Sequence, residues 1–166
     1  PDDAGSGATP HMWAKARSEV SRSGLSPAAI NSLAADVLGV PTDVTDVASV
    51  EDLLAAATAR FGNIHVLCNN AGVGPPAEPQ LWLNTPNDWR WTFGVNVFGV
   101  ANGVHVFLPH MVEHGEDGHV VNTSSPDGGI VAMPSAAVYA SSKAAVVTLT
   151  ECLHHQLCAI GSRIGA

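Results

Sequence analysis

The sequence has 166 residues, enough for one domain with a buried core, and 46% of them are hydrophobic against 13% charged. The net charge is −8 with only seven lysines and arginines, which argues against nucleic acid or an anionic membrane as a partner. No run reaches the roughly 18 uninterrupted apolar residues of a membrane helix. The first seven residues do not resemble a signal peptide, and the three cysteines form no CxxC pair. We therefore expect a cytoplasmic protein with reduced thiols.

Short β-branched runs alternate with longer helical patterns from about residue 36 onward. Residues 37–40 form a short apolar run, which we interpret as a strand. Residues 47–61 have apolar side chains at helical spacing, and Asp46 or Ser49 is suited to cap the start of this helix. Residues 64–68 form a near-continuous apolar run, typical of a buried parallel strand.

The second half of the chain repeats this alternation. Residues 86–111 are predicted to form a long helix entered through Thr85, residues 118–122 a strand, and residues 135–160 a second long helix. Strands that alternate with helices predict a Rossmann-like α/β fold with a doubly wound parallel sheet, covered on both faces. Both long helices are apolar nearly all round, so we expect a partner subunit to cover one side of them.

The strongest chemical signal is the segment from Tyr139 to Lys143, which holds the only tyrosine of the chain. A spacing of four residues places both side chains on one face of a helix. A phenol is a poor base at neutral pH, and a neighbouring ammonium group stabilises its phenolate. Such a pair can exchange a proton with a substrate hydroxyl. Taken alone, the same pattern also fits a packed tyrosine beside a surface lysine.

Other polar residues are expected at the same edge of the sheet. Ser125 lies just past the end of a predicted strand, and a hydroxyl there can donate a hydrogen bond to a carbonyl oxygen. Asn69 to Gly72 follow another strand, and Asp43 and Val44 follow a third. In a doubly wound sheet, ligands bind beyond the carboxyl ends of the strands, so these residues are candidates for a common site.

Together these residues resemble the short-chain dehydrogenase/reductase family over residues 36–166. The resemblance rests on five motifs in the family's order: Asp43-Val44, Asn69-Asn70-Ala71-Gly72, Asn96 within Val95-Asn96-Val97, Asn122-Thr123-Ser124-Ser125, and Tyr139 to Lys143. It implies an NAD(P)-dependent oxidoreductase that moves a hydride between nicotinamide and a secondary alcohol or ketone. The choice between NAD and NADP stays open.

The resemblance also implies a role for each residue. Tyr139 would be the acid/base, and Lys143 would stabilise its phenolate and hold the nicotinamide ribose. Ser125 would orient the substrate oxygen, and Asn96 would anchor a water for proton relay. The cofactor would be bound by Asp43 and Val44 at its adenine, by Asn70, Ala71 and Gly72 at its adenosine ribose, and by Tyr139 and Lys143. The two long helices would form a homodimer or homotetramer interface.

The ends of the sequence depart from the family pattern. Residues 4–9 stand where the Gly-rich phosphate loop is expected, with Asp3 and Thr9 in place of glycines. Arg22, at the place of an arginine that contacts an NADP phosphate in some members, is more simply a surface loop residue. Residues 163–166 fall where the family's sixth strand begins. We therefore interpret residues 1–166 as a single incomplete dinucleotide-binding and catalytic domain, truncated at both ends. The alternative is an inactive remnant that acts only as a dimerising or binding module.

A histidine pattern near the end of the first long helix has a second interpretation. His110-Met-Val-Glu-His114 matches the His-x-x-Glu-His arrangement of one class of zinc peptidases. Because residues 115–118 read as a turn, we interpret this segment as a polar, solvated helix end. The sequence alone therefore predicts no metal site.

Overall fold

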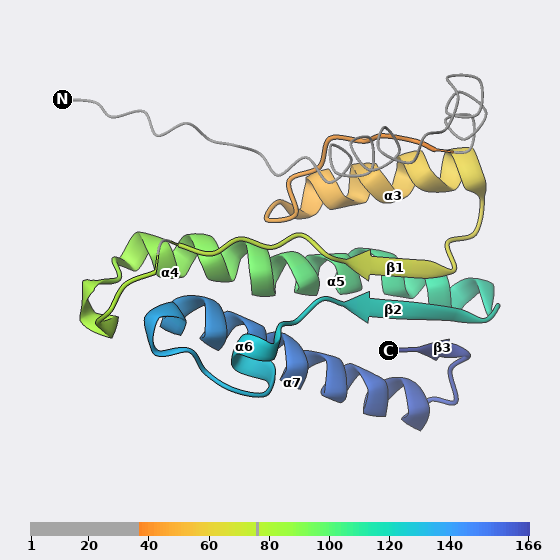
Figure 1. Ribbon diagram of the computed structural model, residues 1–166. Helices are drawn as coiled ribbons and strands as arrows, with labels where there is room; N and C mark the ends of the chain where they lie inside the picture. The colour runs from red at the N-terminus through yellow and green to blue at the C-terminus, as the bar shows by residue number, and fades with distance from the viewer. Residues whose placement is uncertain (1–36, 76) are drawn as a thin grey trace, which may run out of the picture. The chain divides into compact units, whose positions relative to one another are not determined.

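The computed structural model describes residues 37–75 and 77–166 (Figure 1). The chain divides into two units, Pro1–Asp43 and Val44–Ala166, and every helix and strand described below belongs to the second. Residues 37–40, predicted to form a strand, have no regular secondary structure. That prediction was wrong because a strand requires a neighbouring strand to pair its backbone groups, and no described strand pairs with this run.

The first helix of this unit, α3, spans Val47–Phe61, as the spacing of its apolar residues predicted. Asp46 is its N-cap and accepts a hydrogen bond from the backbone amide of Ala48 at 3.1 Å. Gly62, with φ of 77°, ends it, since glycine adopts positive φ without strain.

The first long helix is interrupted. It consists of α4 (Pro86–Phe93), a π-helical turn η2 (Gly94–Phe98) and α5 (Gly99–His114). Thr85 and Asp88 form a capping box at its start, which confirms the predicted entry through Thr85. A π-helical turn inserts an extra residue into a helix, and such turns are frequent at functional sites. Here the turn contains Asn96.

The sheet has three parallel strands in the order β1 (Val66–Asn69), β2 (Gly118–Asn122), β3 (Ile164–Gly165). Asn69 is paired with Asn122 at the carboxyl ends of β1 and β2. β3 begins where the family's sixth strand was expected. A short 3-10 turn η1 (Leu81–Leu83) lies between β1 and α4.

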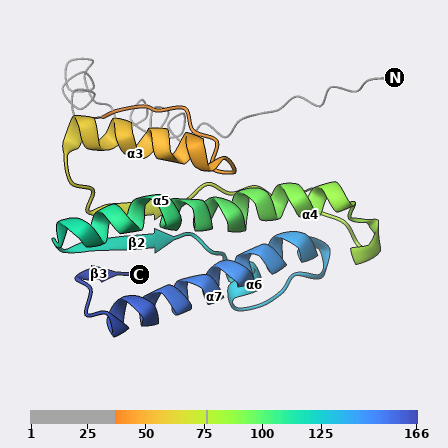
Figure 2. The same cartoon turned by 180° about the vertical axis from the view of Figure 1, so that it is seen from behind.

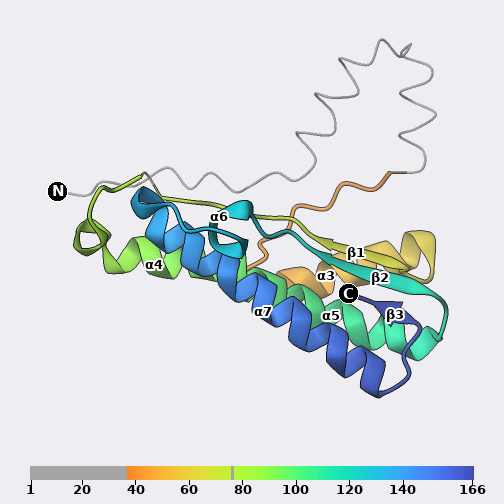
Figure 3. The same cartoon turned by 60° about the horizontal axis from the view of Figure 1, so that its bottom comes forward.

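After β2 come the short helix α6 (Pro126–Gly129), a 3-10 turn η3 (Pro134–Ala136) and the second long helix α7 (Ala137–Ala159). Helix α5 lies in front of the sheet in Figure 2, and α5 and α7 both lie below the strands in Figure 3, so both cover the same face of the sheet. Side chains of α3, α5, α7 and the strands form the main buried core: Val50, Phe107, Met111, Val120, Leu153, Leu157 and Ile164.

The opposite face of the sheet is exposed within the described part of the chain. Val66 is 58% exposed and Val121 is 42% exposed. The sequence predicted a sheet covered on both faces, and the described helices cover one. This face carries His119 beside Val66, and its exposed valines are suited to packing against further protein.

The first long helix from Pro86 to His114, its π-helical turn included, is by length and composition apolar enough to cross a membrane. The core helix of a soluble protein meets the same criterion. Its residues Phe107 and Met111 belong to the main core, so we interpret it as a core helix.

Candidate active site

The candidate site lies at the carboxyl ends of β1 and β2, where two asparagines hold the strands together. The side-chain amide of Asn69 donates to Oδ1 of Asn122 at 2.8 Å. Just beyond, the backbone amide of Thr123 donates to the carbonyl of Asn69 at 3.0 Å, and the Thr123 hydroxyl donates to Oδ1 of Asn70 at 3.1 Å. The two segments that leave the sheet are therefore joined side by side, as expected for a ligand-binding edge.

Lys143 projects from α7 into this edge and is almost completely buried, at 3% exposure. Its ammonium group donates a hydrogen bond to the carbonyl oxygen of Thr123 at 2.8 Å. The loss of hydration on burial lowers the pKa of Lys143 below its ordinary value. The Ser124 hydroxyl donates to the backbone carbonyl of Lys143 at 2.9 Å, which fixes α7 against the end of β2.

Tyr139 lies one turn before Lys143 on the same helix and is half-buried. The Lys143 nitrogen is 5.6 Å from the centroid of the Tyr139 ring, so the predicted pairing of the two side chains is present. A Cβ added at Gly74 would lie 3.2 Å from Cδ2 of Tyr139. Glycine at this position therefore lets the segment after β1 run close against the tyrosine ring.

Asn96 is fully buried in the π-helical turn. Its Oδ1 accepts from the backbone amide of Val73 at 2.8 Å, and its Nδ2 donates to the Val73 carbonyl at 2.8 Å and to the Ser142 hydroxyl at 2.9 Å. Both N–H groups of the amide are thus in use. Asn96 joins the long helix, the segment after β1 and α7 in one network.

Ser125 is the N-cap of α6 and is half-buried. Its hydroxyl oxygen accepts a hydrogen bond from the Asp127 amide at 3.2 Å, and this leaves the hydroxyl hydrogen for donation to another group. The loop that follows depends on Gly128, which has φ of 92° and whose hypothetical Cβ would overlap the carbonyl of Ala140. Ser125 is therefore held beside α7, the helix that carries Tyr139 and Lys143.

Only some of the predicted cofactor-binding residues lie at the candidate site. Asn70, Ala71 and Gly72 lie at the site, and a Cβ at Gly72 would be 3.4 Å from the Lys143 nitrogen. Val44 packs on the start of α5, where a Cβ at Gly99 would be 2.8 Å from its Cγ2, and its carbonyl accepts from Asn102 Nδ2 at 2.9 Å. Asp43 ends the first unit, so its position relative to these residues is not defined. The predicted phosphate-loop segment at residues 4–9 and Arg22 lie outside the described residues.

Three contributors to the site were missed from the sequence. The carbonyl of Thr123 holds Lys143, the Ser142 hydroxyl links Asn96 to the carbonyl of Tyr139, and the backbone of Val73 binds Asn96. Two of these act through backbone atoms, which residue identity does not reveal. The sequence position of Ser142 did indicate a place near the site, because the residue lies between Tyr139 and Lys143 and three residues after the tyrosine.

Comparison with known proteins places this chain in a family. A family model described as short chain dehydrogenase matches residues 13–165. A short chain dehydrogenase/reductase from Burkholderia phymatum, solved in complex with NAD, is 50% identical with a TM-score of 0.74, over 78% of this chain and 45% of that one. A 3-ketoacyl-(acyl-carrier-protein) reductase from Brucella melitensis, solved with NADH, is 31% identical with a TM-score of 0.72, over 76% of this chain and 52% of that one.

Among curated proteins, an uncharacterized oxidoreductase of Staphylococcus saprophyticus is 38% identical over 123 residues, 74% of this chain and 48% of the relative. The chain therefore belongs to the short chain dehydrogenase family, which confirms the resemblance and the Rossmann-like α/β fold predicted from the sequence. It spans about half the length of the relatives that it matches.

Proposed function

We propose that the protein is an NAD(P)-dependent oxidoreductase acting on a secondary alcohol or ketone. The observation that carries this proposal is the buried Lys143 on one helix face with Tyr139, at the carboxyl edge of a parallel sheet. Membership of the short chain dehydrogenase family supports the assignment to the oxidoreductases. The residues of the site support a single proton-transfer step at a substrate oxygen.

Tyr139 serves as the acid/base in this proposal. In the direction of oxidation its phenolate oxygen accepts the proton of the substrate hydroxyl, and in reduction the phenol returns it. The Lys143 ammonium, 5.6 Å from the ring centroid, places a positive charge beside the phenol, where negative charge would develop during proton transfer. Because Lys143 is buried, that charge acts through a poorly screened environment and is stronger than it would be in water.

Ser125 and Asn96 support that step from two sides. The free hydroxyl hydrogen of Ser125 can donate to the substrate oxygen and hold it for the phenol. The Asn96 side chain uses both N–H groups within the protein, so a relay water would be held by the second lone pair of its Oδ1 or by a carbonyl of the π-helical turn. This role of Asn96 in proton relay is part of the proposal.

A nicotinamide dinucleotide fits the residues present on the nicotinamide side of the site. Bound there, it would supply or accept the hydride. Tyr139 and Lys143 would hold its ribose, and the close approach of Gly72 to the Lys143 nitrogen leaves no side chain in the way. Asn70, Ala71 and Val44 would contact the adenosine half. Whether the cofactor is NAD or NADP is left open, as it was from the sequence.

The same long helices support a homodimer or homotetramer. Trp91 and Phe98 on the first long helix are 48% and 60% exposed, more than expected for large apolar side chains without a partner. The rival function, an inactive module that only dimerises, draws on this same observation. All three cysteines are free, which is compatible with the cytoplasmic location we propose.

The experiment that tests the proposed function is substitution of the acid/base. Tyr139→Phe keeps the ring and removes the hydroxyl, so turnover of secondary alcohols with NAD⁺ or NADP⁺ should fall by at least about a hundredfold. Cofactor affinity should fall far less, because Lys143 still holds the ribose in the variant. Ser141→Ala, at an exposed neighbouring position on α7, is the control and should keep full activity. An active wild type with an equally active Tyr139→Phe variant would overturn the role of Tyr139.

A further inference from the structure

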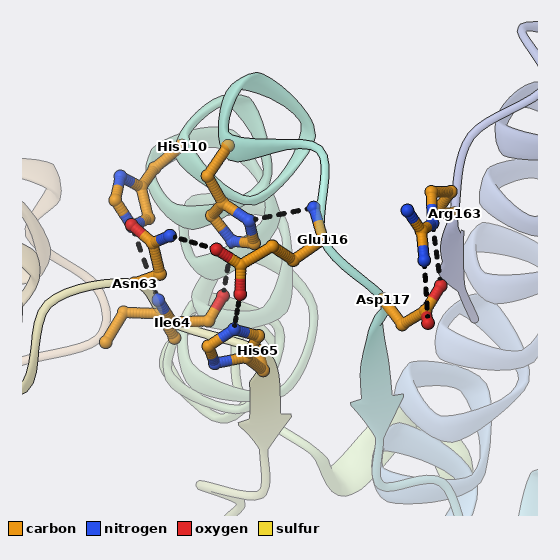
Figure 4. A network of polar contacts seen from close by, with 8 residues as sticks. Asn63, Ile64, His65, His110, Glu116, Asp117 and Arg163 are labelled. Atoms are coloured by element: carbon orange, nitrogen blue, oxygen red, sulfur yellow. Dashed lines mark hydrogen bonds and ion pairs between the residues drawn. The ribbon is translucent and has the colours of Figure 1, made fainter.

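A second polar cluster lies at the opposite edge of the sheet from the candidate active site. Figure 4 shows this cluster at the amino ends of two strands. His65 directly precedes β1, His114 is the last residue of α5, and Glu116 lies in the turn that leads into β2. These are the amino ends of the strands, whereas Tyr139, Lys143 and Ser125 lie at the carboxyl ends. The cluster is therefore separate from the proposed hydride transfer.

The cluster brings together three side chains of the types that bind metal ions. One ligand atom from each of His65, His114 and Glu116 lies within 4.8 Å of the other two. His65 Nε2 and Glu116 Oε2 are 2.6 Å apart, and Asn63 Nδ2 donates to Glu116 Oε1 at 2.7 Å. Both oxygens of the carboxylate are thus held in place by neighbouring side chains.

The hydrogen bonds of His114 define its tautomer. The backbone amide of Glu116 donates to His114 Nδ1 at 3.2 Å, so this nitrogen carries a lone pair. Nε2 must then carry the hydrogen, which it donates to the carbonyl of Ile64 at 3.0 Å. A ring nitrogen bonded to a backbone carbonyl is the arrangement found in metal-ligating histidines, and a bound ion would take the place of the Glu116 amide hydrogen at Nδ1.

We propose that His65, His114 and Glu116 form a binding site for a divalent transition-metal ion of the zinc class. Two imidazoles and one carboxylate are a preferred set for such ions, with water in the fourth position. Ligand distances of about 2.0–2.2 Å require the three ligand atoms to move to about 3.4 Å from one another. The His65 and Glu116 side chains are 46% and 54% exposed, so they can make this adjustment without repacking the core.

The position of the site indicates what the ion would do. It would tie the segment before β1 to the end of α5 and to the turn before β2. Beside it, Arg163 forms a two-pronged ion pair with Asp117, at 2.8 and 2.9 Å, which joins that same turn to β3 (Figure 4). The ion would therefore stabilise the amino edge of the sheet and take no part in the chemistry at the other edge.

The test is metal binding by the chelator-treated chain. Calorimetry measures the binding of Zn²⁺, and the visible spectrum measures the binding of Co²⁺. The expected result is one ion per chain, a tetrahedral cobalt spectrum, and an increase in melting temperature with Zn²⁺. His65→Gln and Glu116→Gln should each weaken binding at least about tenfold, because each removes one of three protein ligands. Both residues are exposed, so these variants should fold, which circular dichroism checks.

His105→Gln is the matched control, since His105 is an exposed histidine on the same helix α5 and outside the cluster. It should bind Zn²⁺ like the wild type. A folded wild type that binds no Zn²⁺ at about 100 µM would overturn the site. Unchanged Zn²⁺ binding in both His65→Gln and Glu116→Gln would also overturn the site. So would a loss of Zn²⁺ binding in His154→Gln, because it would place the ion at the contact between His154 and Cys158 on α7.

Discussion

The ammonium group of Lys143 donates a hydrogen bond to the carbonyl oxygen of Thr123, at 2.8 Å, in the buried interior of the candidate site. This contact ties the helix with the proposed acid/base to the end of β2. It also places a charged group where hydration is lost, with one backbone oxygen as compensation. Burying a charge of this kind costs free energy on folding, and such charges are typically retained for function.

The burial of Lys143 predicts a pH-dependent stability difference between the wild type and Lys143→Met. Its pKa in the folded chain lies below the ordinary value of 10.5, so between these two values the unfolded chain binds more protons than the folded one. The stability that Lys143 contributes therefore rises with pH in this window, and it is lost as pH falls through the folded pKa. The methionine variant has no such group.

Urea unfolding of both proteins from about pH 7 to about pH 10 measures this effect. The unfolding free energy of the wild type minus that of Lys143→Met should increase as the pH approaches 10.5. Lys143→Met also removes a charge beside Tyr139, so both proteins are compared in the Tyr139→Phe background. The remaining titrating groups are common to both and cancel in the difference. A constant difference across the range would mean that the pKa of Lys143 is not lowered.

Asn96→Ala should destabilise the chain by about 2–3 kcal/mol, since it leaves the amide and carbonyl of Val73 and the Ser142 hydroxyl without their buried partner. Asn102→Ala is the control: it removes a single hydrogen bond, to the Val44 carbonyl, and should cost about 1 kcal/mol. Chemical denaturation compares the two. Equal losses would show that the Asn96 network carries no special weight.

Gly128→Ala should lower stability by about 2 kcal/mol or more. The residue has φ of 92°, and its new Cβ would collide with the backbone carbonyl of Ala140, so the loop after Ser125 must shift. Gly129→Ala is matched to it, because its Cβ would meet only ordinary contacts, the nearest at 3.6 Å from Val147, and it should stay within about 0.5 kcal/mol of wild type. Thermal melts of both variants check the difference, and similar melting temperatures would contradict the close packing of this loop on α7.

Local signals in the sequence predicted the elements well. Asp46 and Thr85 cap the helices that their positions indicated, and the strand at Gly118–Asn122 has the predicted bounds. The spacing of Tyr139 and Lys143 predicted a shared helix face, which the structure confirms. These features depend on neighbours within one or two turns of the chain.

What escaped prediction depends on contacts between distant segments. The run at residues 37–40 has strand-like residues, but strand formation is decided by a pairing partner. Nothing local marks the π-helical turn around Asn96, whose amide is bound by Val73, 23 positions away. The histidine pattern at His110 and His114 suggested two ligands on one helix, whereas the cluster in the structure pairs His114 with Glu116 and with His65, which is 51 positions from that glutamate.

The central claim is that this chain has a nicotinamide dinucleotide site, and a thermal-shift titration with NAD⁺, NADH, NADP⁺ and NADPH tests it most directly. A site with a dissociation constant of about 10 µM should stabilise the fold by about 2.7 kcal/mol at about 1 mM ligand, and one cofactor pair should do so more than the other. AMP, which lacks the nicotinamide half, should stabilise less. A cooperative melt that none of the four dinucleotides shifts would contradict the claim and favour the inactive dimerising module.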